Sequence, residues 1–212
     1  MYPIELKDMI FKKKFFYQKK YTPLQQYFFL TQVKSSGETN SSFYIPSTRK
    51  VHFRFKNFCK NLKGIILDIG GGDPTISMQL LPPNSKYLCL EPYNTDNKFK
   101  ILGIAEMLPI TDSKIDVVIF NTSLDHILDY HTAINEAYRV LKKNGKIVIA
   151  TNIWIKDASL LKDDVHFHHF RLNEIMSVIK KKFIIKKMKK YKNPKNQTNR
   201  YTLYLMAQKI LK

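Results

Sequence analysis

The sequence has few cysteines and few acidic residues, and it contains no long apolar run. Two cysteines among 212 residues are too few for a disulfide framework, and they lack the spacing of a zinc site. Charges interrupt every apolar stretch, so we expect no membrane span and no secretory signal. Only 17 acids accompany 36 lysines and arginines, giving a formal net charge of +19. These features favour a cytoplasmic protein with an unusually basic surface.

The basic charge is concentrated in the two flanks of the chain. Residues 1–66 carry a net charge of +10 and residues 155–212 carry +11, whereas residues 67–154 carry −2. A chain of this length with 44% hydrophobic residues can bury one substantial core. We therefore predict a basic, aromatic-rich helical extension over residues 1–60 and one domain over residues 61–212.

A glycine-rich turn directly after an apolar segment is the most informative motif. Residues 64–73 read Gly-Ile-Ile-Leu-Asp-Ile-Gly-Gly-Gly-Asp, and the apolar part is typical of a parallel strand covered on both faces. Gly70, Gly71 and Gly72 permit a sharp turn and let a ligand approach the backbone closely. Pro74 suits the first turn of a following helix. The pattern predicts a ligand-binding turn at the carboxyl edge of a sheet.

The neighbouring residues narrow the class of ligand. A dinucleotide fingerprint would need a glycine where Thr75 stands, and no Gly-Lys-Ser/Thr follows to form a P-loop. Asp68 disfavours a pyrophosphate, whereas acids suit a ligand with hydroxyl groups and a cationic centre. Residues 86–92 predict a second strand that ends at Glu91, about 20 residues after the glycines. That position suits an acid that binds ribose hydroxyls, although a solvated strand end is an alternative for Glu91.

Several ordered motifs over residues 64–152 resemble those of class I methyltransferases that use S-adenosylmethionine, in particular the small-molecule branch. They are the glycine run with Glu91, the segment Gly103-Ile104-Ala105-Glu106-Met107-Leu108-Pro109, the strand-like Asp116-Val117-Val118-Ile119-Phe120-Asn121, and Asn144-Gly145-Lys146-Ile147-Val148-Ile149-Ala150. The resemblance implies S-adenosylmethionine as cofactor. The residues it implies for binding this cofactor are Asp68, Gly70, Gly71, Gly72, Glu91, Ala105, Glu106 and Asn121.

Two positions depart from the pattern of this family. Pro74 stands where the glycine turn often continues, so the turn should lie slightly differently. Ile104 replaces the acid that often binds the adenine amine, so adenine recognition should depend on backbone groups near Ala105 and on apolar packing by Ile104 and Met107.

The expected fold is α/β, a Rossmann-like, mostly parallel seven-stranded sheet with helices on both faces and a C-terminal antiparallel strand hairpin. The apolar runs predict strands near residues 64–70, 86–91, 99–103, 115–121 and 145–151. Strand-like runs at residues 183–185 and 200–207 enclose a polar segment and predict the hairpin.

Residues after the fourth predicted strand are candidates for the acceptor side of the site. Methyl transfer requires alignment of donor and nucleophile and sometimes removal of a proton. His126 is the best candidate for a general base, with Asp125 as its orienting partner or as an alternative base. A structural role for His126 at the start of a helix is the competing interpretation.

A histidine-rich segment precedes the C-terminal hairpin. Asp164, His166, His168 and His169 lie close together, but their spacing matches no recognised set of metal ligands, so we expect no metal. Contact with the substrate is a better interpretation for His166 and His169. Tyr130 and Trp154 are further candidates for this role.

The predicted function is methylation of a small molecule, anionic or sugar-like, and two other functions stay open. Residues 12–21 interleave lysines with aromatic side chains, which suits nucleic acid, so an RNA methyltransferase or binder is one alternative. The same residues also fit a helix whose aromatic face caps the sheet and whose lysines are solvated. The second alternative is a non-catalytic partner subunit that binds an adenosyl nucleoside.

Overall fold

The computed structural model describes residues 49–72, 74–92, 98–155, 166–193 and 199–210. The predicted extension over residues 1–60 lies outside these residues except for its last part. The basic and aromatic segment 12–21 and Asp164 also lie outside them.

The described residues form one seven-stranded sheet in the order β3-β2-β1-β4-β5-β7-β6. The strands are β1 (Ile65–Ile69), β2 (Lys86–Glu91), β3 (Lys100–Leu102), β4 (Ile115–Asn121), β5 (Leu141–Trp154), β6 (Phe183–Lys192) and β7 (Arg200–Lys209). Strands β1 to β5 pair in parallel, whereas β7 pairs antiparallel with both β5 and β6. The predicted sheet and its antiparallel hairpin are therefore confirmed.

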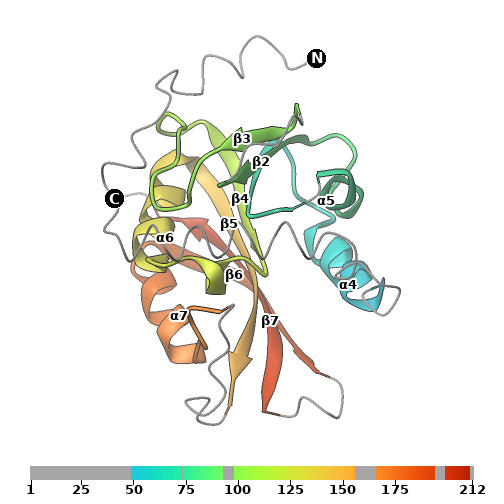
Figure 1. Cartoon of the computed structure of the whole chain (residues 1–212), viewed down its shortest axis with the longest axis vertical. Coiled ribbons are helices and arrows are strands. Elements are labelled where there is room, and N and C mark those ends of the chain that lie inside the picture. The colour runs from blue at the N-terminus through green and yellow to red at the C-terminus, as the bar shows by residue number, and fades with distance from the viewer. Residues whose placement is uncertain (1–48, 73, 93–97, 156–165, 194–198, 211–212) are drawn as a thin grey trace.

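Helices cover both faces of this sheet. They are α4 (Arg49–Cys59), α5 (Pro74–Leu80), α6 (Tyr130–Val140) and α7 (Leu172–Lys180), with a short 3-10 helix η2 (Leu124–His126). Figure 1 shows α4 and α5 on one side of the sheet and α6 and α7 on the other. The helix expected after the glycine turn begins at Pro74, as predicted.

Two apolar clusters lie on the two faces of the sheet. Alternate residues of a strand point to opposite faces. Leu67 and Val118 accordingly pack in the cluster that includes α6 and α7, whereas Ile66 and Val117 pack in the cluster that includes α4 and α5. Cys89 is fully buried in the second cluster, as expected of a small apolar residue. Burial on both faces explains the nearly continuous apolar sequence of β1 and β4.

Strands β5 and β6 extend furthest beyond the ranges that their sequence patterns predict. Strand β5 begins at Leu141, which pairs with Ile115 before an irregularity, and Asn144 there has φ of 62°. The same strand continues to Trp154, past the end of β4. Strand β6 continues through a lysine-rich sequence to Lys192, because β7 supplies a paired neighbour along its whole length.

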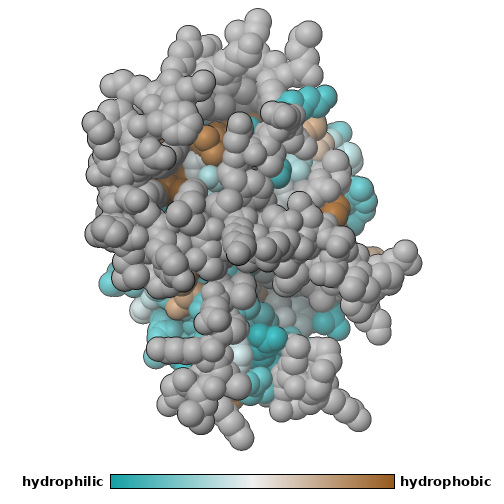
Figure 2. Space-filling model, viewed as in Figure 1, coloured by the Kyte–Doolittle hydropathy of each residue, from teal (hydrophilic) through white to brown (hydrophobic). Residues whose placement is uncertain are grey.

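The described part of the surface in view is mostly polar. In Figure 2 most of the coloured surface is hydrophilic, and the hydrophobic residues in view form small patches. Within the described ranges, no helix is both long enough and apolar enough to cross a membrane.

Candidate functional site

The glycine turn lies between β1 and α5, at the carboxyl edge of the sheet. Gly70 and Gly72 have φ of 69° and 65°, the left-handed region that favours glycine. The Gly70 N–H donates to the carbonyl of Leu90 across 2.9 Å, which fixes the turn against β2. A Cβ on Gly70 would lie 2.8 Å from the Cβ of Ser123, so the turn also packs closely on the residues after β4.

The side chain of Asp68 packs against this turn. Its side chain is 2% exposed and accepts a hydrogen bond from the Tyr87 hydroxyl across 2.9 Å. A Cβ on Gly71 would collide with the Asp68 carboxylate, so the turn rests directly on that side chain. Burial raises the pKa of Asp68 to about 7, with the Tyr87 hydrogen bond acting in the opposite direction. The Oδ1 atom has no hydrogen-bond partner among the residues that the structure describes.

Glu91 lies at the end of β2 and is 4% exposed. Its Oε1 accepts a hydrogen bond from the Gly72 N–H across 2.5 Å. The carboxylate of Glu91 and the glycine backbone are therefore adjacent, as required if both bind one nucleoside. Three features fit an adenosyl ligand. Asp68 is buried and its Oδ1 has no hydrogen-bond partner among the described residues, a Cβ at Gly70 or Gly71 would clash, and the Glu91 carboxylate lies at the end of the next strand.

The Ala105-Glu106 segment lies beside this region and connects it to α6. Ile104 and Met107 form an isolated antiparallel bridge, and Ala105 is buried. The Glu106 carboxylate accepts a hydrogen bond from the Asp129 N–H across 3.2 Å, and burial raises the pKa of Glu106. Glu106 thus fixes the residue that precedes α6.

The end of β4 is joined to the end of β1 by a side chain. The Ser123 hydroxyl donates to the Ile69 carbonyl across 2.5 Å. Asn121 is half-buried at the last position of β4, and Thr122 follows with φ of 58°. The chain then turns into η2, which carries Asp125 and His126 toward the same edge of the sheet as the glycine turn.

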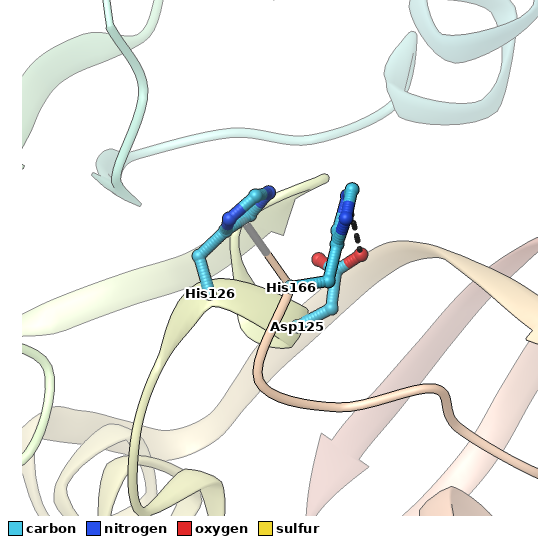
Figure 3. A group of neighbouring side chains, drawn as sticks. All are labelled: Asp125, His126 and His166. Carbon is cyan, nitrogen blue, oxygen red and sulfur yellow. Dashed lines mark ion pairs between the residues drawn. The ribbon is translucent and has the colours of Figure 1, made fainter. Parts of the chain in front are cut away.

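Asp125, His126 and His166 form a cluster at this edge. One ligand atom from each residue lies within 4.8 Å of the others. Figure 3 shows the two imidazole rings side by side, with ring centroids 4.5 Å apart, and the Asp125 carboxylate next to His166. The Nε2 of His166 lies 3.8 Å from Asp125 Oδ2. Burial raises the pKa of Asp125, and the neighbouring His126, His166 and His168 act in the opposite direction.

Backbone hydrogen bonds hold the two parts of the cluster together. The N–H groups of Phe167 and His168 both donate to the carbonyl of Asp125, across 2.9 and 3.2 Å. The Nε2 of His168 lies 2.8 Å from the Ile127 carbonyl, so its side chain also binds the chain after η2. The segment before α7 is therefore attached to η2 through main-chain groups.

Aromatic and cationic side chains extend the site beyond the cluster. The Trp154 ring lies 4.5 Å from the His169 ring, and the Arg200 guanidinium lies 5.0 Å from the centroid of Trp154. The ring of His169 is 6.3 Å from that of His166. Tyr130, at the start of α6, contacts the ring of Phe170 edge-on at 5.0 Å.

The structure thus brings together most of the residues that the sequence pointed to. His166 joins Asp125 and His126, which the spacing of residues 164–169 did not indicate. His168 contacts backbone carbonyls instead of joining the cluster, although its place in the sequence is similar. Arg200 was missed, because a single arginine at the start of a strand gives no functional signal.

Solved structures share this fold. The chain aligns with 1,6-didemethyltoxoflavin-N1-methyltransferase of Burkholderia thailandensis, crystallised with 1,6-didemethyltoxoflavin and S-adenosylhomocysteine, with a TM-score of 0.67. That alignment covers 90% of this chain and 92% of that one at 13% identity. The N-methyltransferase NodS of Bradyrhizobium japonicum, in complex with S-adenosylhomocysteine, aligns with a TM-score of 0.66 at 11% identity, covering 87% and 99% of the two chains.

Sequence relatives match part of the chain. The ubiquinone/menaquinone biosynthesis C-methyltransferase UbiE of Rickettsia typhi is 29% identical over 133 residues, which are 53% of each protein. The uncharacterized protein YafE of Escherichia coli is 29% identical over 86 residues, 36% of this chain and 42% of YafE. The chain thus spans about half, or less, of the length of these relatives.

The sheet order and the glycine turn after β1 match the class I S-adenosylmethionine-dependent methyltransferase fold that the sequence motifs indicated. The chain belongs to the family described as hypothetical methyltransferase, whose family model matches residues 27–212.

Proposed function

We propose that the protein transfers a methyl group from S-adenosylmethionine to a small-molecule acceptor. The observation that carries this proposal is the placement of two groups at one edge of the sheet. The glycine turn and Glu91 lie at the ends of β1 and β2, and the Asp125, His126 and His166 cluster follows β4. Ser123 connects the two groups through its bond to Ile69.

The donor side would be formed by residues that leave the backbone accessible. Gly70, Gly71 and Gly72 would line the donor, with Asp68 supporting the turn and Glu91 accepting hydrogen bonds from ribose hydroxyls. Ala105, Glu106 and Asn121 are proposed as neighbouring contacts.

His126 is proposed as the proton acceptor on the acceptor side. S-adenosylmethionine supplies a methyl group on a sulfonium centre, so the protein has to align the nucleophile and, for an acceptor that carries a proton on the attacking atom, remove that proton. An imidazole suits that task near neutral pH, and His126 is half-buried next to the carboxylate of Asp125. Asp125 would stabilise the imidazolium that forms.

Aromatic and cationic side chains beside the cluster support a small, planar and anionic acceptor. Trp154 and His169 offer two neighbouring rings, tilted by 34° to each other, and Arg200 lies over the indole. His166 and Tyr130 are proposed as further acceptor contacts. Two relatives named above act on small molecules according to their names, which supports the same class of acceptor.

Thermal unfolding with three ligands tests the donor side of the proposal. S-adenosylmethionine and S-adenosylhomocysteine should each raise the melting temperature in a concentration-dependent way, whereas NAD should not. Stabilisation by NAD alone would contradict the proposal. Release of S-adenosylhomocysteine in the presence of a panel of planar anionic acceptors then separates an enzyme from a non-catalytic binder.

A nucleic-acid substrate is the second candidate, and the lysines of β6 favour it. This strand lies at the edge of the sheet, and Lys186, Lys189, Lys190 and Lys192 are exposed. Lysines on an edge strand also prevent pairing with other chains, which is an ordinary structural role. Tight RNA binding that weakens steeply as salt increases would favour this candidate, whereas weak binding at physiological salt would exclude it.

A further inference from the structure

Three side chains in the acceptor cluster have the composition of a transition-metal site. Asp125 offers a carboxylate oxygen, and His126 and His166 each offer an imidazole nitrogen. Two imidazoles and one carboxylate are a common ligand set for divalent first-row metals, and imidazole is a poor ligand for magnesium or calcium. With neutral imidazoles the set carries one negative charge, which suits a divalent cation.

The distances within the cluster fit shared coordination of one cation. The Nε2 of His166 lies 3.8 Å from Asp125 Oδ2, which is too long for a hydrogen bond. Ligand atoms that sit about 2.0–2.2 Å from one metal are separated from each other by roughly 3–4 Å. The whole set spans 4.8 Å, so a small inward movement of the side chains would close it around a cation.

Burial of Asp125 supplies an independent argument. The residue is 5% exposed, and within the described part of the chain its Oδ1 has no hydrogen-bond partner. A buried carboxylate oxygen without a partner is costly. A cation bound between Asp125 and the two imidazoles would remove this cost.

The backbone holds the three ligands ready for binding. The N–H groups of Phe167 and His168 bind the Asp125 carbonyl, which places His166 beside the carboxylate of Asp125. The His126 N–H donates to the Ser123 carbonyl across 3.1 Å, which closes η2. Ligands held by main-chain bonds lose little freedom when a metal binds.

We propose that Asp125, His126 and His166 bind one divalent transition-metal ion, such as Zn²⁺ or Co²⁺, with remaining positions open to water. Binding does not depend on the proposed methyl transfer, but one consequence does. A bound metal occupies the nitrogen lone pair of His126 and prevents it from accepting a proton. Metal loading should therefore inhibit transfer without weakening donor binding.

The test is a titration of the untagged, chelator-treated full chain with Co²⁺. Calorimetry and visible absorption monitor the binding. The wild-type protein should bind one Co²⁺ and develop ligand-field absorption. His166→Ala and Asp125→Asn should each weaken binding by more than about 100-fold, since even residues that only orient the ligands change affinity 10- to 100-fold. His131→Ala is the matched control, because His131 is exposed on α6 outside the cluster.

Each outcome separates this inference from the proposed function. Absence of Co²⁺ binding, or unchanged affinity for Co²⁺ in both His166→Ala and Asp125→Asn, would overturn the metal site. Binding of S-adenosylhomocysteine by the same samples would show that the proposed function still stands. Melting temperatures of the variants confirm that they are folded. Asp125→Asn preserves the shape of the side chain, so it keeps the test decisive if His166→Ala unfolds.

Discussion

The carboxylate of Glu91 accepts a hydrogen bond from the backbone N–H of Gly72 across 2.5 Å, which joins the end of β2 to the turn after β1. The two residues are 19 positions apart in the sequence. Glu91 contributes its side chain to this bond, and Gly72 contributes its backbone N–H. An adenosyl ligand that uses both must share Glu91 with the turn or displace Gly72 from it. If the donor binds as proposed, the donor and the Gly72 N–H would both use the carboxylate of Glu91.

Replacing Glu91 with glutamine should weaken donor binding by about 10- to 100-fold, because hydrogen bonds to a charged acceptor become bonds to a neutral one. Calorimetric titration with S-adenosylhomocysteine measures this change. Glu174→Gln is the control, since Glu174 is an exposed acid in the first turn of α7. Equal affinities for the two variants would mean that Glu91 is not a donor ligand.

Alanine at Gly70 should both destabilise the protein and abolish tight donor binding. The residue has φ of 69°, which costs an L-residue roughly 1–2 kcal/mol, and the new Cβ would press on Ser123. Gly64→Ala is a matched control, because Gly64 has φ of 88° but lies at the opposite end of β1. Urea unfolding should show a loss of stability in both variants, and only Gly70→Ala should lose affinity for S-adenosylhomocysteine in conditions where it is folded.

The stability of the protein should depend on pH through Asp68. An aspartate in the unfolded chain has a pKa near ~3.9, whereas burial raises the pKa of folded Asp68 to about 7. The folded protein thus holds one more proton between about pH 4 and pH 7, so the contribution of Asp68 to stability is fully present below this window and is lost as pH rises through it.

The Asp68→Asn variant tests this dependence, since asparagine can still accept the Tyr87 hydrogen bond. Urea unfolding of both proteins at several pH values gives the difference in their free energies of unfolding. Between pH 4 and pH 7, the free energy of unfolding of the wild-type protein should fall by a few kcal/mol relative to that of the variant. A difference that stays constant would show that folded Asp68 is ionised throughout.

The His126→Ala variant should lose turnover while its affinity for the donor stays the same. A positioned general base contributes about 10²- to 10⁴-fold to a rate, so a decrease in kcat of that size is expected. His131→Ala, on the exposed start of α6, should retain full activity. Loss of donor affinity in His126→Ala would place this residue on the donor side instead.

The sheet could be predicted from sequence because its signals are local. Each of β1, β2 and β4 is a mostly apolar segment, and the glycines follow β1 directly. The length of β6 could not be predicted, because its lysines form a strand only through pairing with β7. Strand propensity in such a segment comes from its neighbour, which a single-sequence pattern does not contain.

For the same reason, only part of the cluster of Asp125, His126 and His166 could be predicted from sequence. Asp125 and His126 follow a recognisable strand, so their location at the sheet edge could be inferred. His166 reaches them through backbone hydrogen bonds that span about 40 residues of sequence, and no local pattern encodes such a contact. The choice between His166 and His168 depends on which ring meets the carbonyls of Ile127 and Leu128.

The attachment of Phe167 and His168 to the Asp125 carbonyl has an evolutionary consequence. Every residue except proline carries the N–H groups that make this attachment, so it would survive replacement of almost any side chain nearby. Positions 166 and 169 can therefore vary while the main chain that carries them keeps its hydrogen bonds to Asp125. Such a site can acquire new acceptors one substitution at a time, and directed evolution of acceptor choice should begin at these two positions.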